Sequence, residues 1–589
     1  MKRSHRRILA ALAVALLAAA PLYLAPFTIT LLDYIGVYAL VALGLVLITG
    51  IGGLVSFGQA SFVGIGAYST AWLSTQMGLS PWLGLLLALV STAAVATILG
   101  AATLRLQGHF LSLSTIAWGL AIYFSFGNIE GLGRFNGIPA IPPIAIGSIE
   151  LTGSEQIYYL VWTILLVALL LSHNLLGSRT GRALRALRGG NTLVESLGID
   201  AFRVKLATFV IAAVLAAISG WLYAHMNRIV SPSPFDVTMG ITYLMMAMVG
   251  GAGYLLGAIV GAALITLLKN GVQDLLPAIA PGAAGQLEIV AFSALFILFL
   301  QYARNGIVPF VAQWLPQPAP EPPPAVAPLA RREQPAPGRT LLQVESAVRR
   351  FGGLVAVNDV SFEVRAGEIL GLIGPNGAGK STMFNLLTGA LPASGGRIVF
   401  DGTDITRAPQ RRIARAGVAR TFQHVKLRPK MNLLDNVLLG TYARTGAGFL
   451  SGALRLDRAE EARATQEALR QLERVGLGAD PYELAGNLPL GKQRVLEIAR
   501  ALAADPMLLV LDEPAAGLRR QEKQALAALL RALREEHLTI LLVEHDMEFV
   551  MGLVDRVVVM DFGCKLCEGE PAEVRADARV QQAYLGGVA

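Results

Sequence analysis

The sequence contains little cysteine and little charge. Of its 589 residues, 15% are Asp, Glu, Lys or Arg, whereas 54% are hydrophobic. The two cysteines, Cys564 and Cys567, have neither a second pair nor a histidine cluster beside them, which excludes a tetrahedral zinc site. We interpret them as small apolar residues on a late strand. The net charge of +8 is scattered, without a basic stripe interleaved with aromatic residues, which argues against nucleic-acid binding.

The hydrophobic residues are concentrated in one half of the chain. Residues 1–310 contain long uncharged runs, whereas residues 341–589 have the composition of a soluble α/β protein. We therefore expect a polytopic α-helical membrane domain over 1–310 that crosses a lipid bilayer, a Pro-rich linker over 311–340 and an α/β domain over 341–589. At about 20 apolar residues per crossing, the membrane domain has about ten transmembrane helices, near 8–26, 29–50, 54–76, 82–104, 109–127, 157–176, 205–227, 237–252, 254–270 and 286–303.

Ten crossings bring both ends of the membrane domain to the same side of the bilayer. The basic start followed by Ile8–Ala20 resembles a secretory signal, but its removal would leave nine crossings, so we keep the first helix. Residues 237–270 form either a tight hairpin of two helices or one long broken helix. Cytoplasmic loops are enriched in Lys and Arg, and of the fifteen such residues up to position 310 this topology places twelve inside: Lys2, Arg3, Arg6, Arg7, Arg105, Arg179, Arg182, Arg185, Arg188, Arg203, Lys205 and Arg304.

Two stretches of the membrane domain combine polar and apolar residues. The third predicted span contains Ser56, Gln59 and Ser61 among glycines. Such residues either line a translocation pathway or let helices pack closely, and both interpretations stand. The inside loop 178–203 combines four arginines within 179–188 with apolar residues at helical spacing. It is either a short helix that docks on a soluble partner and transmits motion, or a solvated basic loop that fixes orientation.

The linker is rich in proline. Nine prolines lie between Leu315 and Gly338, a composition that forms neither helix nor sheet and extends as a semi-rigid spacer. We interpret it as a plain tether that joins the two halves without fixing their geometry.

A phosphate-binding loop opens the soluble half. Residues 374–382 read Gly-Pro-Asn-Gly-Ala-Gly-Lys-Ser-Thr, after the apolar run Ile369–Ile373 and before a helical pattern. In this arrangement backbone N–H groups and a helix N-terminus converge on one anion. The chain is therefore predicted to bind ATP, with Lys380 on the β- and γ-phosphates and the Ser381 hydroxyl on Mg²⁺. The residues expected to hold the nucleotide here are Gly374, Asn376, Gly377, Gly379, Lys380, Ser381 and Thr382.

Two later apolar runs end in acidic or titratable residues. Leu508–Leu511 precedes Asp512 and Glu513, and Thr539–Val543 precedes Glu544 and His545. Buried parallel strands deliver such residues to the carboxyl edge of the sheet, where ligands bind. We expect Asp512 to hold Mg²⁺ and Glu513 to act as general base, a role worth about 10²–10⁴ in rate. His545 would bind the γ-phosphate.

These residues resemble the ATP-binding-cassette family over essentially all of 341–587. The resemblance implies that Phe351 stacks on adenine, that Gln423 senses Mg²⁺ and contacts the membrane part, and that His545 is the switch histidine. The family signature falls at Leu488–Gln493, where Gly491 would clamp the γ-phosphate of the opposing subunit. Pro489 and Lys492 depart from the usual Ser and Gln or Glu. The nucleotide-site prediction thus comprises Phe351, Gly374, Asn376, Gly377, Gly379, Lys380, Ser381, Thr382, Gln423, Gly491, Asp512, Glu513 and His545.

Segments of the membrane domain and of the C-terminal region indicate which subgroup of the family the chain resembles. Gly50–Tyr68 and Gly181–Arg188 are similar to the permeases, and Glu544–Met551 and Glu568–Arg575 to the cassettes, of branched-chain amino-acid importers. The resemblance implies a half-transporter of a bacterial inner membrane that imports a small solute. It also implies a second permease–cassette half and an extracytoplasmic solute-binding protein, and it favours residues 179–198 as the coupling segment. An exporter, or a membrane protein regulated by ATP binding, is the alternative; urea, amides and aromatic acids remain alternative solutes.

Overall fold

The computed structural model describes residues 14–106, 108–279, 306–314 and 326–585, together with residues 12, 290, 293, 294, 297, 301 and 302. The chain divides into two compact units. The first comprises residues 1–177 and 202–320, and the second comprises residues 178–201 and 321–589. The expected division into a helical half and an α/β half is confirmed, but the loop 178–201 groups with the α/β half rather than with the helices that flank it in sequence.

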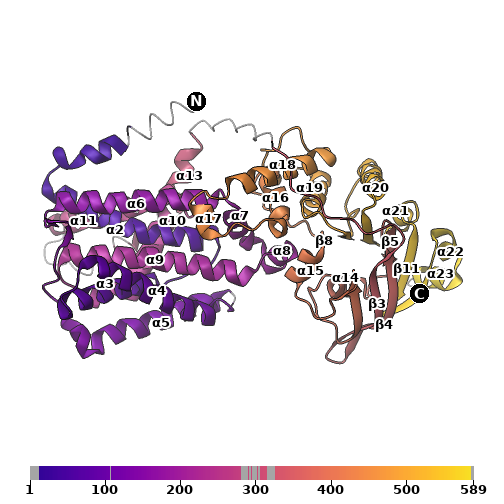
Figure 1. Cartoon of the computed structure of the whole chain (residues 1–589), viewed down its shortest axis with the longest axis horizontal. Coiled ribbons are helices and arrows are strands. Elements are labelled where there is room, and N and C mark those ends of the chain that lie inside the picture. The colour runs from indigo at the N-terminus through magenta and orange to yellow at the C-terminus, as the bar shows by residue number, and fades with distance from the viewer. Residues whose placement is uncertain are drawn as a thin grey trace. The chain divides into compact units, whose positions relative to one another are not determined.

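The first unit is a bundle of apolar helices (Figure 1). Pro26 and Pro81 each occupy the first turn of a helix, where no backbone N–H partner is lost. Helix α2 packs against α6 and α11, α3 packs against α4, and α10 packs against α11. The main helices are α2 (Pro26–Leu45), α3 (Gln59–Gln76), α4 (Pro81–Thr103), α5 (His109–Asn128), α6 (Ser154–Leu176), α9 (Ala201–Asn227), α10 (Val237–Gly251), α11 (Leu255–Ile279) and α13 (Ile307–Ala312).

Six helices in the described part of the chain are long and apolar enough to cross a membrane: α2 with its π-helical extension η2 (Val46–Ile51), α4, α5, α6, α9 and α11. The predicted count of about ten is therefore not confirmed. Helix α3 coincides with a predicted span but is not among the six, and α10 is a shorter apolar helix. The predicted spans 8–26 and 286–303 lie partly or mostly outside the described residues. Residues 237–270 form two helices joined at Gly251–Tyr254, which is the hairpin alternative.

The second unit contains two sheets. The first is mainly parallel, with strand order β12-β11-β5-β10-β9-β8. Its central strands β5, β9 and β10 are fully buried, because all but their end residues Thr539 and Asp512 are apolar or glycine. Its strands are β5 (Ile369–Ile373), β8 (Val418–Arg420), β9 (Leu508–Asp512), β10 (Thr539–Val543), β11 (Arg556–Asp561) and β12 (Cys564–Gly569). Cys564 is exposed and Cys567 half-buried on β12, and the described residues contain no cluster of metal-binding side chains.

The second sheet is antiparallel, with order β4-β3-β6-β7. Its strands are β3 (Thr340–Phe351), β4 (Leu354–Arg365), β6 (Gly395–Phe400) and β7 (Thr403–Asp404), so the predicted strands over Leu341–Val364 are confirmed. One apolar core lies between this sheet and the parallel sheet, and another lies between the parallel sheet and its helices. The helices are α14 (Lys380–Leu387), α15 (Gln410–Ala416), α16 (Leu433–Leu438), α17 (Phe449–Ala453), α18 (Arg458–Arg474), α19 (Leu490–Leu502), α20 (Arg520–Glu535), α21 (Met547–Met551), α22 (Pro571–Ala576) and α23 (Ala578–Leu585).

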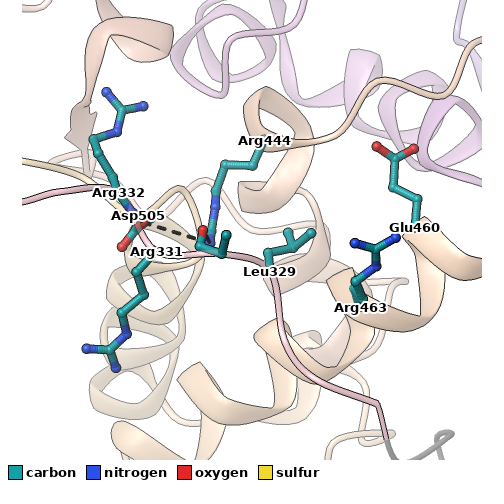
Figure 2. A pocket seen from close by; sticks show the side chains of 8 residues that line it. Leu329, Arg331, Arg332, Arg444, Glu460, Arg463 and Asp505 are labelled. Carbon is teal, nitrogen blue, oxygen red and sulfur yellow. Dashed lines mark hydrogen bonds and ion pairs between the residues drawn. The ribbon is translucent and has the colours of Figure 1, made fainter.

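The second part of the linker is docked on this unit, which differs from the plain tether expected. We call residues 326–337 the linker strap. The Arg332 backbone N–H donates to Asp505, and its guanidinium donates to the carbonyls of Ala416 (2.5 Å) and Arg415 (3.1 Å). Figure 2 shows Arg444 directed at Asp505 beside Leu329 of the strap, and Arg444 also donates to the Ala330 carbonyl. The strap has no regular secondary structure because its prolines lack N–H donors. It is held by the side chains of Asp505 and Arg444 and by the backbone carbonyls of Arg415 and Ala416.

Candidate functional site

The phosphate-binding loop follows β5 and leads into α14. Gly379 precedes the helix with φ of 94°, a conformation open to glycine, and a Cβ there would lie 2.4 Å from the Ala356 carbonyl. Lys380 is buried and donates to the carbonyls of Gly374 (2.7 Å) and Pro375 (2.9 Å). Burial lowers the pKa of its ammonium, while nearby Glu513 and Asp512 oppose that shift. The Lys380 ammonium therefore lies against the backbone of its own loop, where an anion bound by the loop would also contact it.

The loop also exposes groups that can reach a ligand. Asn376, Gly377 and the Ser381 side chain are exposed, and Thr382 is half-buried. The N-terminus of α14 directs backbone N–H groups at the concave side of the loop. The structure thus places the predicted residues 374–382 in one continuous loop that leads into the first turn of α14.

Asp512 ends the buried strand β9 as the sequence predicts. Its carboxyl is 7% exposed, and Oδ1 has no hydrogen-bond partner among the described residues. Burial raises the pKa of Asp512 to about 6, with Glu513 contributing in the same direction and Arg420 opposing it. A buried, unpaired carboxylate oxygen requires an explanation, and a cation beside it would supply one.

Glu513 lies one residue further, in a left-handed conformation with φ of 44°. Its N–H donates to Val543 of the neighbouring strand, so the turn is fixed between β9 and β10. Gln423 Nε2 donates to Glu513 Oε2 at 3.0 Å, and His545 Nδ1 lies 3.7 Å from the same oxygen. The tertiary structure therefore brings together Gln423, Glu513 and His545, which are far apart in sequence.

Two predicted site residues lie in separate surroundings. Phe351 ends β3, is 42% exposed and has the Arg349 guanidinium 4.5 Å from its ring centre. Gly491 lies in the first turn of α19, where a Cβ would meet Glu522 Oε1 at 2.4 Å. Pro489 precedes this helix without a side-chain hydrogen bond to its N-terminus. Phe351 is thus exposed, and at the start of α19 Pro489 and Leu490 are exposed whereas Gly491 is buried against Glu522.

Sequence reasoning missed the residues that hold the Gln423 loop. Glu497, fully buried on α19, accepts hydrogen bonds from the Lys426 and Phe422 backbones at 3.2 and 3.5 Å. Arg500, equally buried, donates to Glu497 (2.8 Å) and to the Lys426 carbonyl (2.7 Å). Only the Glu–Arg spacing of three on a helix signalled such a pair.

Two further groups lie beside Asp512: Glu544, which the sequence placed at this edge without a role, and Arg420, which it missed. Glu544, buried at the end of β10, accepts from the backbones of Ala515 and His545. Arg420 donates to Thr388 (2.7 Å) and lies over the Phe384 and Phe422 rings, and burial lowers its pKa to about 10. These groups fix the positions of the turns that carry Glu513 and Gln423.

The loop 178–201 forms two short helices, α7 (Arg179–Ala186) and α8 (Asn191–Ser196). Arg182, 5% exposed, donates to both Glu461 oxygens at 2.8 and 2.9 Å. The Arg179 guanidinium lies 3.6 Å from the Tyr442 ring centre and donates to the Tyr442 carbonyl. Burial lowers the pKa of Arg179. These contacts are those of a docked segment, and a solvated loop would not bury its arginines.

Three profiles of known families match the chain. Residues 27–300 match the branched-chain amino acid transport system permease component, residues 357–516 match the ABC transporter family, and residues 564–589 match the branched-chain amino acid ATP-binding cassette transporter. The permease and cassette matches fall on the two halves expected from composition.

Individual proteins match the cassette half. The high-affinity branched-chain amino acid transport ATP-binding protein LivG of Salmonella typhimurium is 46% identical over 249 residues, which is 42% of this chain and 98% of LivG. The ribose import ATP-binding protein RbsA of Geobacillus kaustophilus is 33% identical over 241 residues, 41% of this chain and 47% of RbsA. A nucleotide-free ATP-binding cassette from an ABC transporter, solved by crystallography, is 31% identical with a TM-score of 0.38 and covers 42% of this chain and 98% of its own.

The LivG match extends over nearly the whole relative, and the permease profile independently covers the helical half. An ABC cassette hydrolyses ATP to drive transport, and here it follows the permease on one polypeptide. The chain therefore belongs to the ABC transporters, in the branched-chain amino acid importer family, as a permease fused to its ATP-binding cassette.

Proposed function

We propose that this chain is one half of an ATP-driven importer for branched-chain amino acids, or for related amino acids and amides, in a bacterial inner membrane. The permease and LivG matches support an amino-acid solute, while the RbsA match leaves other small polar solutes open. The arginine-rich inside loops support a cytoplasmic N-terminus and cassette. We assign the permease to residues 1–310, the linker to 311–340 and the cassette to 341–589.

Each predicted site residue has a role in this proposal. Glu513 orients and deprotonates the attacking water, Gln423 holds Glu513 in place until the nucleotide binds, and His545 binds the γ-phosphate. Phe351 stacks on the adenine. The triphosphate occupies the loop made by Gly374, Asn376, Gly377, Gly379, Lys380, Ser381 and Thr382.

Magnesium fits the residues present. The unpaired Oδ1 of Asp512 and the exposed hydroxyl of Ser381 are oxygen donors of the kind Mg²⁺ prefers, and the Gln423 carbonyl oxygen is a third. When bound with ATP, the ion neutralises charge that develops on the phosphates. A cation beside Asp512 would also offset the cost of its burial.

The site is completed by a second cassette. Phe351, the phosphate loop and the exposed Leu490 that precedes Gly491 lie on surfaces that two cassettes can close around nucleotide. We therefore infer a second permease–cassette half, either another copy or a matched pair, and an extracytoplasmic solute-binding protein that delivers the solute.

The observation that carries the proposal is the docking of α7 on the cassette. Arg182 and Glu461 form a bidentate pair at low exposure, and such charge-assisted pairs fix orientation as well as position. Since α7 continues from α6 of the permease, movement of the cassette has a direct mechanical path to the membrane helices.

The test uses vesicles that contain the chain with its partner subunits and binding protein. We expect Lys380→Ala, introduced in both cassettes where the pair is identical, to abolish both ATP hydrolysis and uptake of [³H]leucine. We expect Arg182→Ala to lower uptake at least tenfold while ATP turnover stays within twofold of wild type. Arg182→Lys keeps the charge but loses the bidentate geometry, so its uptake should lie between those of wild type and Arg182→Ala.

Three outcomes would contradict the proposal. Leucine uptake that survives Lys380→Ala would separate transport from hydrolysis, and net ATP-dependent loss of leucine from preloaded vesicles would indicate an exporter. ATP binding without turnover by the wild-type chain would indicate a regulatory protein, which the missing hydroxyl at Pro489 would then explain.

A further inference from the structure

The connection from α2 into α3 buries an uncapped helix N-terminus. Helix α2 ends in the π-helical turn η2, and residues 52–58 then run without regular helix to Gln59, the first residue of α3. Gly58 precedes α3 and offers no side chain to cap it. Gln59, Ala60 and Ser61 are each at most 2% exposed. The positive end of an 18-residue helix thus faces the interior of the bundle without a capping side chain.

Two side chains at this point have no polar partner. The Ser56 hydroxyl and both amide atoms of Gln59 make no hydrogen bond within the described part of the chain, at 2% and 1% exposure. Side chains in an α-helix lean toward its N-terminus, so the Gln59 amide lies over the start of α3. Buried polar groups are nearly always paired, and each exception requires an explanation.

Three polar groups near this point do have hydrogen-bond partners. Ser61 donates to the Gly119 carbonyl at 3.3 Å, and the Phe57 N–H donates to Thr115 at 3.1 Å. Thr49 donates to the Leu54 carbonyl at 2.8 Å. At the start of α3 itself, the side chains without a hydrogen bond among the described residues are therefore those of Ser56 and Gln59.

An apolar wall adjoins these donors. The Trp118 ring of α5 lies against Gly58, where a Cβ would come within 2.2 Å of it, and it lies 5.1 Å from the Phe62 ring, centre to centre. Trp118 Nε1 also has no partner within the described residues. Gly240 of α10 closes another side, since a Cβ there would lie 2.2 Å from the Phe57 carbonyl.

We propose that the start of α3, with Gln59 and Ser56, binds the carboxylate of the transported solute. This inference rests on the proposed import function. A helix N-terminus, an amide NH₂ and a hydroxyl are all suited to an anionic acceptor. The Trp118 and Phe62 rings offer apolar surface to the rest of an aliphatic amino acid. Close packing of helices through small residues, the alternative interpretation, does not account for the Ser56 hydroxyl and the two Gln59 amide atoms, which have no partner among the described residues.

The first test measures [³H]leucine uptake in vesicles that contain every subunit. Gln59→Leu is matched in size and lacks the amide, and Gln59→Glu is matched in size and repels a carboxylate. We expect each to lower uptake at least tenfold, with the amount of chain in the membrane and its ATP turnover within twofold of wild type. Ser61→Ala, two residues further along α3 and already hydrogen-bonded to the Gly119 carbonyl, should retain uptake within twofold.

The outcomes separate this inference from the import function. Wild-type vesicles that fail to take up leucine would contradict the import function itself. Wild-type uptake with normal uptake by Gln59→Leu would overturn the site, and normal uptake by Gln59→Glu would exclude a carboxylate ligand.

A second measurement does not depend on transport. The chain has two cysteines, both in the cassette, so Cys564→Ser with Cys567→Ser gives a thiol-free background. Gln59→Cys in that background should react with N-ethylmaleimide, and leucine should slow the reaction at least threefold. Ser69→Cys, about 15 Å further along α3, should react at a rate that leucine does not change. An introduced thiol at position 59 that never reacts, or that leucine does not protect, would overturn the site.

Discussion

The cassette and the permease bury polar groups in different ways. On α19, Glu497 and Arg500 are almost fully buried, yet each makes at least two hydrogen bonds to the loop 422–426 or to the other. At the start of α3, Gln59 and Ser56 are similarly buried, and their side chains have no hydrogen bond in the part of the chain that the structure describes. Asp512 resembles the second group, although it lies in the cassette.

The presence or absence of hydrogen-bond partners distinguishes buried side chains that stabilise the fold from buried side chains that bind a ligand. A buried charge with several partners loses much free energy when one partner is removed, because the other is left uncompensated. A buried group without a partner opposes folding, so its presence is explained by what it binds. The comparison predicts opposite responses to conservative substitution in the two groups.

The largest effect is expected for Asp512→Asn. Loss of a metal ligand should lower the ATPase kcat about 10²-fold or more, because a bound cation stabilises the transition state by several kcal/mol. Without nucleotide, the variant should be more stable than wild type at pH 7.5 by about 1–3 kcal/mol. ATP turnover and the thermal midpoint of the full chain in detergent measure both quantities.

The pH dependence of that stabilisation is a further check. The folded pKa of Asp512, about 6, exceeds the ordinary 3.8, so protonation of this group favours the folded state at low pH and that contribution is lost above pH 6. The advantage of Asp512→Asn should therefore shrink as the pH falls from 7 toward 4. A variant that is less stable than wild type at pH 7.5 would contradict the assignment of Asp512 to the ligand-binding group.

Glu497→Gln should act mainly on stability. Removing one charge of this buried pair leaves Arg500 uncompensated, at an expected cost of about 3–5 kcal/mol. For a domain of this size that corresponds to a fall of about 6–20 °C in the thermal midpoint of the cassette. Calorimetry of the full chain in detergent measures the cassette transition.

The matched control for Glu497→Gln is Arg463→Ala. Arg463 is exposed on α18, and among the described residues it donates to the Ala459 carbonyl one turn away. The thermal midpoint of Arg463→Ala should therefore stay within about 1 °C of the wild-type value. A small stability loss in Glu497→Gln, equal to that of the control, would remove the distinction between the two groups of buried residues.

A smaller effect is expected in the linker strap, which is held by partly exposed contacts. Arg332→Ala removes two side-chain hydrogen bonds to the carbonyls of Ala416 and Arg415 and should cost about 0.5–3 kcal/mol. It should also speed proteolysis between residues 326 and 337 in the full chain. The adjacent Arg331 is exposed and has no hydrogen bond in the described residues, so Arg331→Ala should change neither measurement. Equal behaviour of the two variants would indicate a free tether.

The sequence by itself determined the elements whose signals are local. The spacing of 374–382 specified the phosphate loop, and four apolar residues before Asp512 specified β9, because a turn or a buried strand depends on neighbours within a few positions. Apolar runs likewise predicted α2, α4, α5, α6, α9 and α11.

Tertiary structure alone decided which distant side chains meet. The Gln423–Glu513 hydrogen bond, the docking of Arg182 on Glu461 and the attachment of the linker strap each join residues that no local pattern relates. The sequence left Gln59 open between a pathway and helix packing, because the absence of a partner is a property of everything around a side chain. Local geometry is encoded within a few residues, whereas the pairing or isolation of a buried polar group depends on the whole packed interior.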